Sequence, residues 1–232
     1  MNHTLHVLAL SDLHGFLPQI TKSADIAILA GDIVPLELQE NLAHSKWWFE
    51  NEFAGWVKSL PVKRVFMIAG NHDFYLETIK KRDLTALYKA TDKKLKYLMN
   101  EETIYTDKNN AKWSIFGTPY CSQLYGWPFM RKDSILEQKF TKMPKTVDII
   151  ISHDPPFACG DADVILAKPQ LGHLGNKPLA QRVMMTDYKL LVSGHIHTGD
   201  HSFNEQYRTV NVSILNEQYK QGYDPFYITI EK

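Results

Sequence analysis

Five short apolar runs, each followed at once by a loop containing Asp, Asn or His, constrain the fold of this chain more than any other feature. The runs cover residues 5–10, 26–30, 65–69, 147–151 and 190–192. They are rich in Val, Ile and Leu and alternate little with polar residues, which is typical of strands buried on both faces of a sheet. We therefore predict that these runs are buried strands of an α/β protein.

Apolar residues at helical spacing lie between these strands. One such pattern covers residues 37–59 and stops before Pro61, and another covers 83–99 on an otherwise lysine-rich face. A weaker pattern predicts a third helix over 176–186. This alternation of predicted strands and helices is typical of a sheet wrapped by helices.

Further strands are expected at 112–116 and 227–230, and a hairpin is expected across 201–213 with Asn204-Glu205 in its turn. The 232 residues contain no repeat and no Pro/Gly/Ser-rich linker, and domains usually span about 150 residues. We therefore predict that residues 1–232 form a single domain.

Composition excludes several classes of protein. The 26 Lys and Arg residues balance 26 Asp and Glu residues, whereas a nucleic-acid-binding surface usually brings a basic excess. No apolar run approaches the roughly 18 residues of a membrane span. The two cysteines, Cys121 and Cys159, are too few for a disulfide framework, and Met1 leads into the first apolar run without a basic leader. We expect a cytoplasmic protein with no membrane span and no dedicated nucleic-acid-binding surface.

The loops after the five runs contain most of the residues that could carry chemistry. They are the segments 11–15, 31–32, 70–73, 152–156 and 193–197, and they hold half of the ten histidines. Ligands of open α/β sheets bind beyond the carboxyl ends of the strands, so these loops should converge on one site.

The donor atoms in these loops are carboxylate oxygen, amide oxygen and imidazole nitrogen, without thiolate. This mixture suits Mn, Fe or Zn better than Ca or an iron–sulfur cluster. In Asp12-x-His14 and His195-x-His197 the alternate side chains can point the same way. Seven candidate ligands are too many for one tetrahedral ion and suit two ions that share a carboxylate: Asp12, His14, Asp32, Asn71, His153, His195 and His197.

Each motif alone has an ordinary structural explanation. Asp12-x-His14 could be a polar loop or a helix cap, Gly31-Asp32 a turn, and 153–156 a loop that enters a proline-fixed turn. All five motifs in this order, each at a strand end, favour a metal site instead.

Together the motifs resemble those of the calcineurin-like metallophosphoesterase superfamily. They are Asp12-x-His14, Gly31-Asp32, Gly70-Asn71-His72-Asp73, His153 and Gly194-His195-x-His197, and they span residues 12–197. A narrower branch, the metallophosphoesterase-domain proteins related to class III cyclic nucleotide phosphodiesterases, is similar at further segments. These are 117–120, 125–127, 153–156 and 211–213.

The resemblance implies a four-layered α/β/β/α sandwich with two mixed sheets, the second of which takes strands after residue 200. It implies that Asp12, His14 and His197 hold one divalent ion, that Asn71, His153 and His195 hold the other, and that Asp32 bridges them. Manganese is the first candidate, with iron, zinc or magnesium as alternatives. His72 would lie beside the substrate, with Asp73 orienting its imidazole.

Positions 35 and 195 distinguish this chain from particular subgroups of the superfamily. Purple acid phosphatases place a Tyr three residues after the bridging Asp, where this chain has Pro35. Some members of the narrower branch carry Gly where this chain has His195, which is intact. We therefore expect full binding of the second ion and no ferric tyrosinate.

The expected chemistry is hydrolysis of a phosphate ester. Two ions roughly 3.5–4 Å apart would hold a bridging water whose pKa falls toward about 7, and the resulting hydroxide would attack phosphorus in line with the leaving oxygen. His72 would donate the proton that the leaving oxygen needs, a role that contributes typically about 10²–10⁴-fold. Asp73 would fix the tautomer of His72.

We accordingly expect a dinuclear metal-dependent phosphodiesterase for small phosphodiesters, with cyclic nucleotides the first substrates to test. A phosphomonoesterase or nuclease is the alternative within the same fold. A non-catalytic binding scaffold is the contrasting class, and the intact His72 and full ligand set disfavour it.

The substrate contacts expected are Asn71, His72, Tyr120 and Trp127. The aromatic residues of loop 118–133 either stack on a nucleobase or form an apolar cluster under the loop. The segment 154–176, which contains Asp161, His173 and Asn176, either walls the pocket or is ordinary loop surface.

Overall fold

Two five-stranded sheets form the centre of the computed structural model, which describes residues 3–159, 173–199 and 201–232. The first sheet has the order β12 (Phe226–Glu231), β1 (Thr4–Leu10), β2 (Ile26–Ala30), β3 (Arg64–Ile68) and β4 (Leu95–Tyr97). The second has the order β11 (Thr209–Asn211), β10 (Leu190–Ser193), β9 (Ile149–Ser152), β6 (Lys112–Thr118) and β5 (Glu101–Thr106). Neighbouring strands are parallel except at β12 and β5, so both sheets are mixed, as predicted.

Side chains of the inner strands alternate between two cores. In β1, Val7 and Ala9 face the core between the sheets, where they join Ile149 and Ile151 of β9. Leu8 of the same strand faces the outer core under the helices. Because both faces are covered, the inner strands are continuous apolar runs in the sequence.

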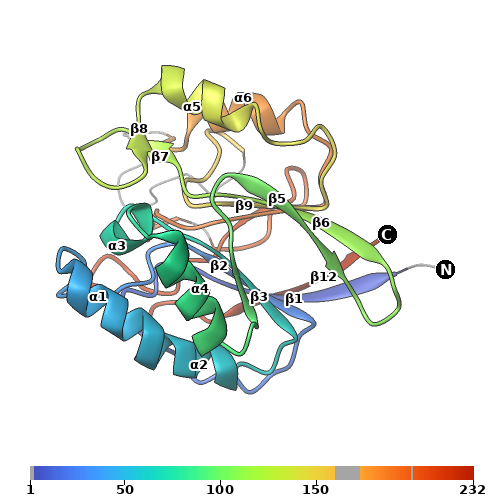
Figure 1. The fold of residues 1–232 in the computed structure, drawn as a ribbon. Coiled ribbons are helices and arrows are strands. Elements are labelled where there is room, and N and C mark those ends of the chain that lie inside the picture. The colour runs from blue at the N-terminus through green and yellow to red at the C-terminus, as the bar shows by residue number, and fades with distance from the viewer. Residues whose placement is uncertain (1–2, 160–172, 200) are drawn as a thin grey trace.

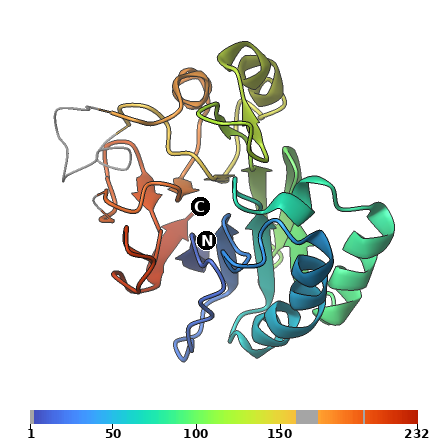
Figure 2. The ribbon, with the colours of Figure 1, turned by 90° about the vertical axis from the view of Figure 1, so that its left-hand side faces the viewer.

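Helices cover the outer face of each sheet and complete the predicted α/β/β/α sandwich (Figures 1 and 2). On the first sheet lie α1 (Leu42–Trp48), the π-helical segment η1 (Phe49–Phe53), α2 (Ala54–Ser59) and α4 (Lys81–Ala90). On the second lie α5 (Asp133–Phe140) and α6 (Lys177–Val183). The short helix α3 (Phe74–Glu77) and the strand pair β7 (Cys121–Ser122) and β8 (Met130–Arg131) complete the described elements. No helix among the described residues has the length and apolar character needed to cross a bilayer.

The five inner strands and the strand at 112–116 are confirmed, but the predicted helix over 83–99 is wrong in its second half. The helix ends at Ala90, and Asp92 and Lys93 adopt the left-handed backbone region. Leu95 then pairs with Val65 of β3 in parallel register. The spacing of Leu95 and Leu98 also fits a helix, so the sequence pattern could not separate the two structures.

The expected hairpin across 201–213 is also wrong. Only an isolated bridge joins Asn204 and Thr209, and β11 pairs instead with β10 in parallel. The strand expected at 227–230 exists as β12, but it pairs with β1 in the first sheet rather than joining the second. Both errors concern pairing between distant segments.

The helix predicted over 37–59 begins at Leu42, because the Asn41 side chain accepts the N–H of His44 at 3.1 Å and caps the helix there. The helix predicted over 176–186 is confirmed as α6 with a shorter end. No sequence pattern predicted α3 or α5.

Candidate metal centre

All five predicted loops emerge at one edge of the sandwich, where the parallel strands of both sheets end. Figure 2 faces this edge. Asp12 and His14 follow β1, Asp32 follows β2, and Asn71 follows β3. From the second sheet, His153 lies just after β9, and His195 and His197 follow β10. The fold therefore brings together all seven predicted metal ligands.

The carboxylate of Asp32 lies at the centre of this group. Its Oδ2 is 3.2 Å from Nε2 of His153 and 3.8 Å from Nε2 of His14. Its Oδ1 accepts the backbone N–H of His72 at 2.8 Å. One oxygen is thus fixed by the backbone, while the other is directed at imidazole nitrogens from both sheets.

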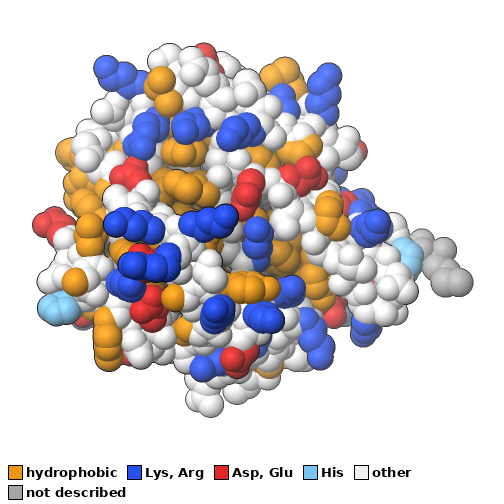
Figure 3. Space-filling view, viewed as in Figure 1, with side chains coloured by type: hydrophobic (Ala, Val, Ile, Leu, Met, Phe, Trp, Pro, Cys, Tyr) orange, Lys and Arg blue, Asp and Glu red, His pale blue; other side chains and the backbone are white. Residues whose placement is uncertain are grey.

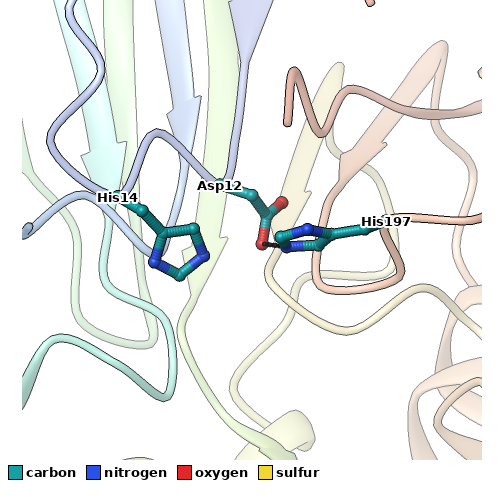
Figure 4. A group of neighbouring side chains, drawn as sticks. All are labelled: Asp12, His14 and His197. Carbon is teal, nitrogen blue, oxygen red and sulfur yellow. Dashed lines mark ion pairs between the residues drawn. The ribbon is translucent and has the colours of Figure 1, made fainter. Parts of the chain in front are cut away.

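A first trio of donors consists of Asp12, His14 and His197, drawn in Figure 4, whose donor atoms lie within 4.8 Å of one another. Nε2 of His197 is 3.3 Å from Oδ1 of Asp12. The other nitrogen of His197 donates to the carbonyl oxygen of Asn216 at 3.0 Å, which turns Nε2 toward the site. The Ser213 hydroxyl donates to Oδ2 of Asp12 at 2.6 Å and orients that carboxylate.

A second trio consists of Asp32, His153 and His195. Nδ1 of His153 donates to the carbonyl oxygen of Ala30 at 2.8 Å, so its Nε2 faces the site. Oδ1 of Asn71 lies 3.1 Å from this Nε2 and adds an amide oxygen to the trio.

His72 lies next to both trios. Its Nε2 is 3.9 Å from Oδ2 of Asp32, nearly the distance found for His14, and His14, Asp32 and His72 also form a group that could hold an ion. Geometry alone therefore allows His72 to bind either a metal or the substrate.

The backbone at the site occupies conformations that L-residues rarely adopt. Asp12, His14, Asp32 and His195 have φ values of 53°, 41°, 53° and 69°. Left-handed non-glycine residues cost free energy, and they cluster at functional sites where the surrounding structure enforces them.

Two glycines of the motifs are required by close approach. A Cβ at Gly70 would overlap the carboxylate of Asp32, and a Cβ at Gly194 would overlap the side chains of Ser11 and Asp12. The glycines therefore let the loops from different strands pack against the central carboxylates.

The donor set fits divalent ions. His14 is buried, and neither of its ring nitrogens has a hydrogen-bond partner among the described residues. Burial lowers the pKa of His14 to about 4, so its imidazole is neutral, which is the form that binds a metal. An ion beside the ring would give this buried polar group the partner it lacks.

The carboxylates of the site favour positive charge around them. Burial alone would lower the pKa of His153 and of His197, but Asp32 raises the pKa of His153 to about 10 and Asp12 raises that of His197 to about 9. Against the opposing effect of burial, the same contacts hold the pKa values of Asp12 and Asp32 well below the usual range. Bound cations would replace these protons as the compensating charge.

The prediction that Asp73 orients His72 is wrong. Oδ1 of Asp73 accepts the backbone N–H groups of Ile33 and Val34, each at 3.0 Å, and its Oδ2 accepts that of Gly70 at 2.8 Å. These bonds turn the carboxylate into the protein. Nδ1 of His72 instead lies 2.6 Å from Oε1 of Gln39.

The two aromatic residues predicted to contact substrate have different positions. Tyr120 is only 6% exposed, packs against Phe129, and accepts a hydrogen bond from Lys139 Nζ at 3.0 Å. It belongs to an apolar cluster under the loop, so its predicted substrate contact is wrong. Trp127 stands edge-on against the ring of His72 at 4.6 Å between centroids.

The segment 154–176 is largely outside the described residues, and Asp161 lies there. His173 is exposed and packs edge-on against Phe157. Asn176 is buried, caps α6, and donates to Oδ2 of Asp154 at 3.1 Å. Asn176 therefore has a structural role.

Sequence reasoning missed three residues beside the site. Gln39 contacts His72, and Oδ1 of Asp154 lies 3.5 Å from Nε2 of His195. The Tyr219 ring stands edge-on to His14 and His197, at centroid distances of 5.0 and 5.4 Å. Gln39 lies in a segment that was predicted to be helical and Tyr219 in a loop without a recognisable pattern, whereas Asp154 directly follows a predicted ligand.

A pocket of about 430 Å³ opens over the donors. Its lining consists of Asp32, His72, Leu124, Leu174, His195, Ile196, His197, Thr198, Glu217 and Tyr219. This described lining contains a carboxylate from Glu217 but no Lys or Arg. Exposed Lys and Arg side chains lie instead on the outer surface, for example over α4 (Figure 3).

The fold and the donor clusters are those expected of a metallophosphoesterase, and comparison with known protein families agrees. The sequence matches the calcineurin-like phosphoesterase family over residues 5–199, and the chain therefore belongs to this family. The predicted superfamily is confirmed.

Among curated relatives, metallophosphoesterase domain-containing protein 1 of Homo sapiens is 27% identical over 96% of this chain and 70% of its own length. Probable rhamnogalacturonate lyase C of Emericella nidulans is 28% identical over 85% of this chain, but the match spans only 18% of that protein. A solved crystal structure with 14% sequence identity superimposes with a TM-score of 0.64 and covers 99% of this chain and 95% of its own. At that identity it supports the fold alone.

Proposed function

We propose that this protein is a metal-dependent phosphodiesterase that hydrolyses small phosphodiesters at the pocket over Asp32. The observation that carries the proposal is the position of Asp32 Oδ2, which faces imidazole nitrogens of His14, His72 and His153 at 3.2–3.9 Å. A buried carboxylate with such neighbours is suited to bridge two cations.

Two ions are assigned to two ligand groups. Asp12, His14 and His197 would hold one, Asn71, His153 and His195 would hold the other, and Asp32 would belong to both. When bound, such ions supply the charge that binds phosphoryl oxygens and lowers the pKa of a water molecule toward about 7. The oxygen and nitrogen donors make manganese the first ion to test, followed by iron, zinc and magnesium.

His72 is the proposed general acid. Its Nδ1 is occupied by Gln39, so its Nε2 remains for the pocket. Burial lowers the pKa of His72, and a bound anionic ester opposes this effect because it favours the imidazolium ion. The imidazolium donates its Nε2 proton to the leaving oxygen.

The charges of the pocket favour diesters over monoesters. A phosphomonoester carries nearly two negative charges at neutral pH and a diester carries one. The described lining offers no Lys or Arg to offset the extra charge, and Glu217 would repel it. Phosphomonoesterase activity is therefore the second candidate.

Cyclic nucleotides are the first substrates to test. The pocket is within the roughly 300–1,000 Å³ usual for small ligands. Trp127 lies beside His72 and offers an aromatic surface for a nucleobase. Kinship with the class III cyclic nucleotide phosphodiesterases is part of this proposal.

The test compares the manganese-loaded protein on bis(4-nitrophenyl) phosphate and on 4-nitrophenyl phosphate, with Asp32→Asn as the inactive control. We expect a higher kcat/KM on the diester. The 2′,3′-cyclic, 3′,5′-cyclic and linear nucleotide esters then define the substrate. Two bound ions with no hydrolysis of any ester would support the binding scaffold instead, and faster hydrolysis of the monoester would support the phosphomonoesterase.

A further inference from the structure

The imidazole of His72 is held by contacts on several sides. Its backbone N–H donates to Oδ1 of Asp32 at 2.8 Å, and its Nδ1 lies 2.6 Å from Oε1 of Gln39. The rings of His14 and Trp127 stand edge-on against it at 4.8 and 4.6 Å between centroids. The two aromatic neighbours limit the tilt of the ring, whereas the bond to Gln39 decides which nitrogen faces the pocket.

Gln39 is itself held in place by its own loop. The neighbouring residue Leu38 donates its N–H to the carbonyl oxygen of Pro35 at 2.9 Å, and its own carbonyl oxygen accepts bonds from Asn41 N–H and Ser45 Oγ. This loop thereby connects β2 to α1 with a fixed path. The Gln39 amide is therefore presented to His72 from a hydrogen-bonded loop.

Asp73 supports the same loop from the other end. Its Oδ1 accepts the N–H groups of Ile33 and Val34, which lie at the start of the segment that leads to Gln39. The carboxylate that follows His72 in the sequence thus acts on the loop backbone, and an amide carried by that loop contacts the imidazole.

We propose that Gln39 is a positioning residue that fixes the orientation of His72 in the reaction proposed above, on which this inference rests. An amide oxygen can only accept, so Nδ1 carries a proton and Nε2 faces the leaving group. The Gln39 amide carries no charge. It can accept a hydrogen bond from Nδ1 of both the neutral ring and the imidazolium ion, so it can orient the ring in both protonation states.

The proton-transfer step balances with this arrangement. A hydroxide oxygen forms the new bond to phosphorus, while the bond from phosphorus to the leaving oxygen breaks and its electron pair goes to that oxygen. The leaving oxygen takes the proton from Nε2, and the electron pair of the N–H bond stays on the ring. His72 ends neutral, with its remaining proton on Nδ1 still donated to Gln39.

The test uses leaving groups of different basicity, because only a poor leaving group needs the acid. We compare Gln39→Leu with wild type on a diester that releases 4-nitrophenol and on one that releases an alkyl alcohol. We expect the ratio of kcat on the alkyl ester to kcat on the nitrophenyl ester to fall about tenfold or more, part of the ~10²–10⁴ that a positioned acid contributes. Gln39→Glu keeps an acceptor and should retain most of the wild-type ratio.

Gln138→Leu is the matched control, because Gln138 is an exposed glutamine on α5. It should leave the ratio and the metal content at the wild-type values. An equal loss on both esters in Gln39→Leu would overturn the inference, because a purely structural defect lowers both rates alike. If the wild-type protein hydrolyses both diesters and Gln39→Leu shows this equal loss, only the role of Gln39 is contradicted. The proposed phosphodiesterase activity then stands.

A second readout does not depend on turnover. In the zinc-loaded, ¹⁵N-histidine-labelled protein, the His72 resonances are those that disappear in His72→Ala. We expect a protonated Nδ1 in wild type and loss of that proton signal in Gln39→Leu, with recovery in Gln39→Glu. Identical His72 spectra in wild type and Gln39→Leu would overturn the inference, and this test stands even if wild type hydrolyses neither ester and the proposed function fails.

Discussion

Oδ2 of Asp32, at the end of a strand in the first sheet, lies 3.2 Å from Nε2 of His153, at the end of a strand in the second. This contact joins the two halves of the sandwich at the candidate metal centre. Both side chains are almost completely buried. In the metal-free protein the carboxylate and the imidazole form an ion pair. A bound cation would replace the imidazole proton as the charge that compensates the carboxylate.

Replacing Asp32 tests this centre most severely. We expect Asp32→Asn to lose at least one bound ion and more than about 100-fold in kcat, since changes outside the direct ligands already cost about 10–100-fold. Metal content by mass spectrometry and kcat on a diester measure the two effects. Asp187→Asn, at a carboxylate that is 80% exposed, is the control and should behave as wild type. Full metal content and activity in Asp32→Asn would contradict the assignment.

His72→Ala separates an acid from a ligand. If His72 donates a proton, the variant keeps its metal content and loses about 10²–10⁴-fold in kcat on an alkyl ester, with a smaller loss on a nitrophenyl ester. His44→Ala, at an exposed histidine of α1, controls for the substitution. Loss of an ion in His72→Ala would instead show that His72 belongs to the third donor group, with His14 and Asp32.

Asp73→Asn distinguishes support of the loop from orientation of His72. The amide has one acceptor oxygen where the carboxylate accepts three backbone N–H bonds, so a buried N–H loses its partner. We expect the free energy of unfolding to fall by about 1–3 kcal/mol in urea denaturation. The kcat ratio between leaving groups should change far less than in Gln39→Leu. Unchanged stability with a selective loss on alkyl esters would restore Asp73 as the partner of His72.

Metal binding should strengthen with rising pH. Asp32 and Asp12 raise the pKa of His153 to about 10 and of His197 to about 9, so both imidazoles hold protons at pH 7 in the metal-free protein. An ion must displace these protons, and each proton released contributes a factor of about ten in affinity per pH unit. Calorimetric titration with manganese at pH 6, 7 and 8 measures this dependence, and a flat profile would contradict it.

The same raised pKa values have the opposite effect on the stability of the metal-free protein, which should fall as pH rises. Histidines whose folded pKa exceeds the ordinary 6.5 stabilise the protein fully below that pH, and this contribution is lost as pH rises through about 9–10. The urea midpoint of the metal-free protein should therefore fall between pH 6.5 and 9.5, and bound metal should reduce the fall.

The sequence predicted the inner strands and the convergence of their loops because local composition determines both. Val7 and Ala9, for example, lie in residues 7–10 of β1, which are apolar throughout because this part of the strand is covered on both faces. The donors follow such runs directly, so their place at one edge of the sandwich required only the rule for parallel strands.

Contacts between distant segments escaped prediction. Leu95 has the spacing of a helix but pairs with Val65, and β12 returns to β1 across nearly the whole chain. Gln39 lies in a loop without a motif, and only the folded structure brings its amide to His72. The adjacency of Asp73 to His72 was misleading, because its carboxylate points to backbone N–H groups.

The proposed phosphodiesterase requires two divalent ions, one on either side of Asp32. The most direct measurement is anomalous diffraction at the manganese edge from crystals grown with manganese. We predict two peaks roughly 3.5–4 Å apart, one beside His14 and one beside His153, with Asp32 Oδ2 between them. A single peak, or none near Asp32, would contradict it.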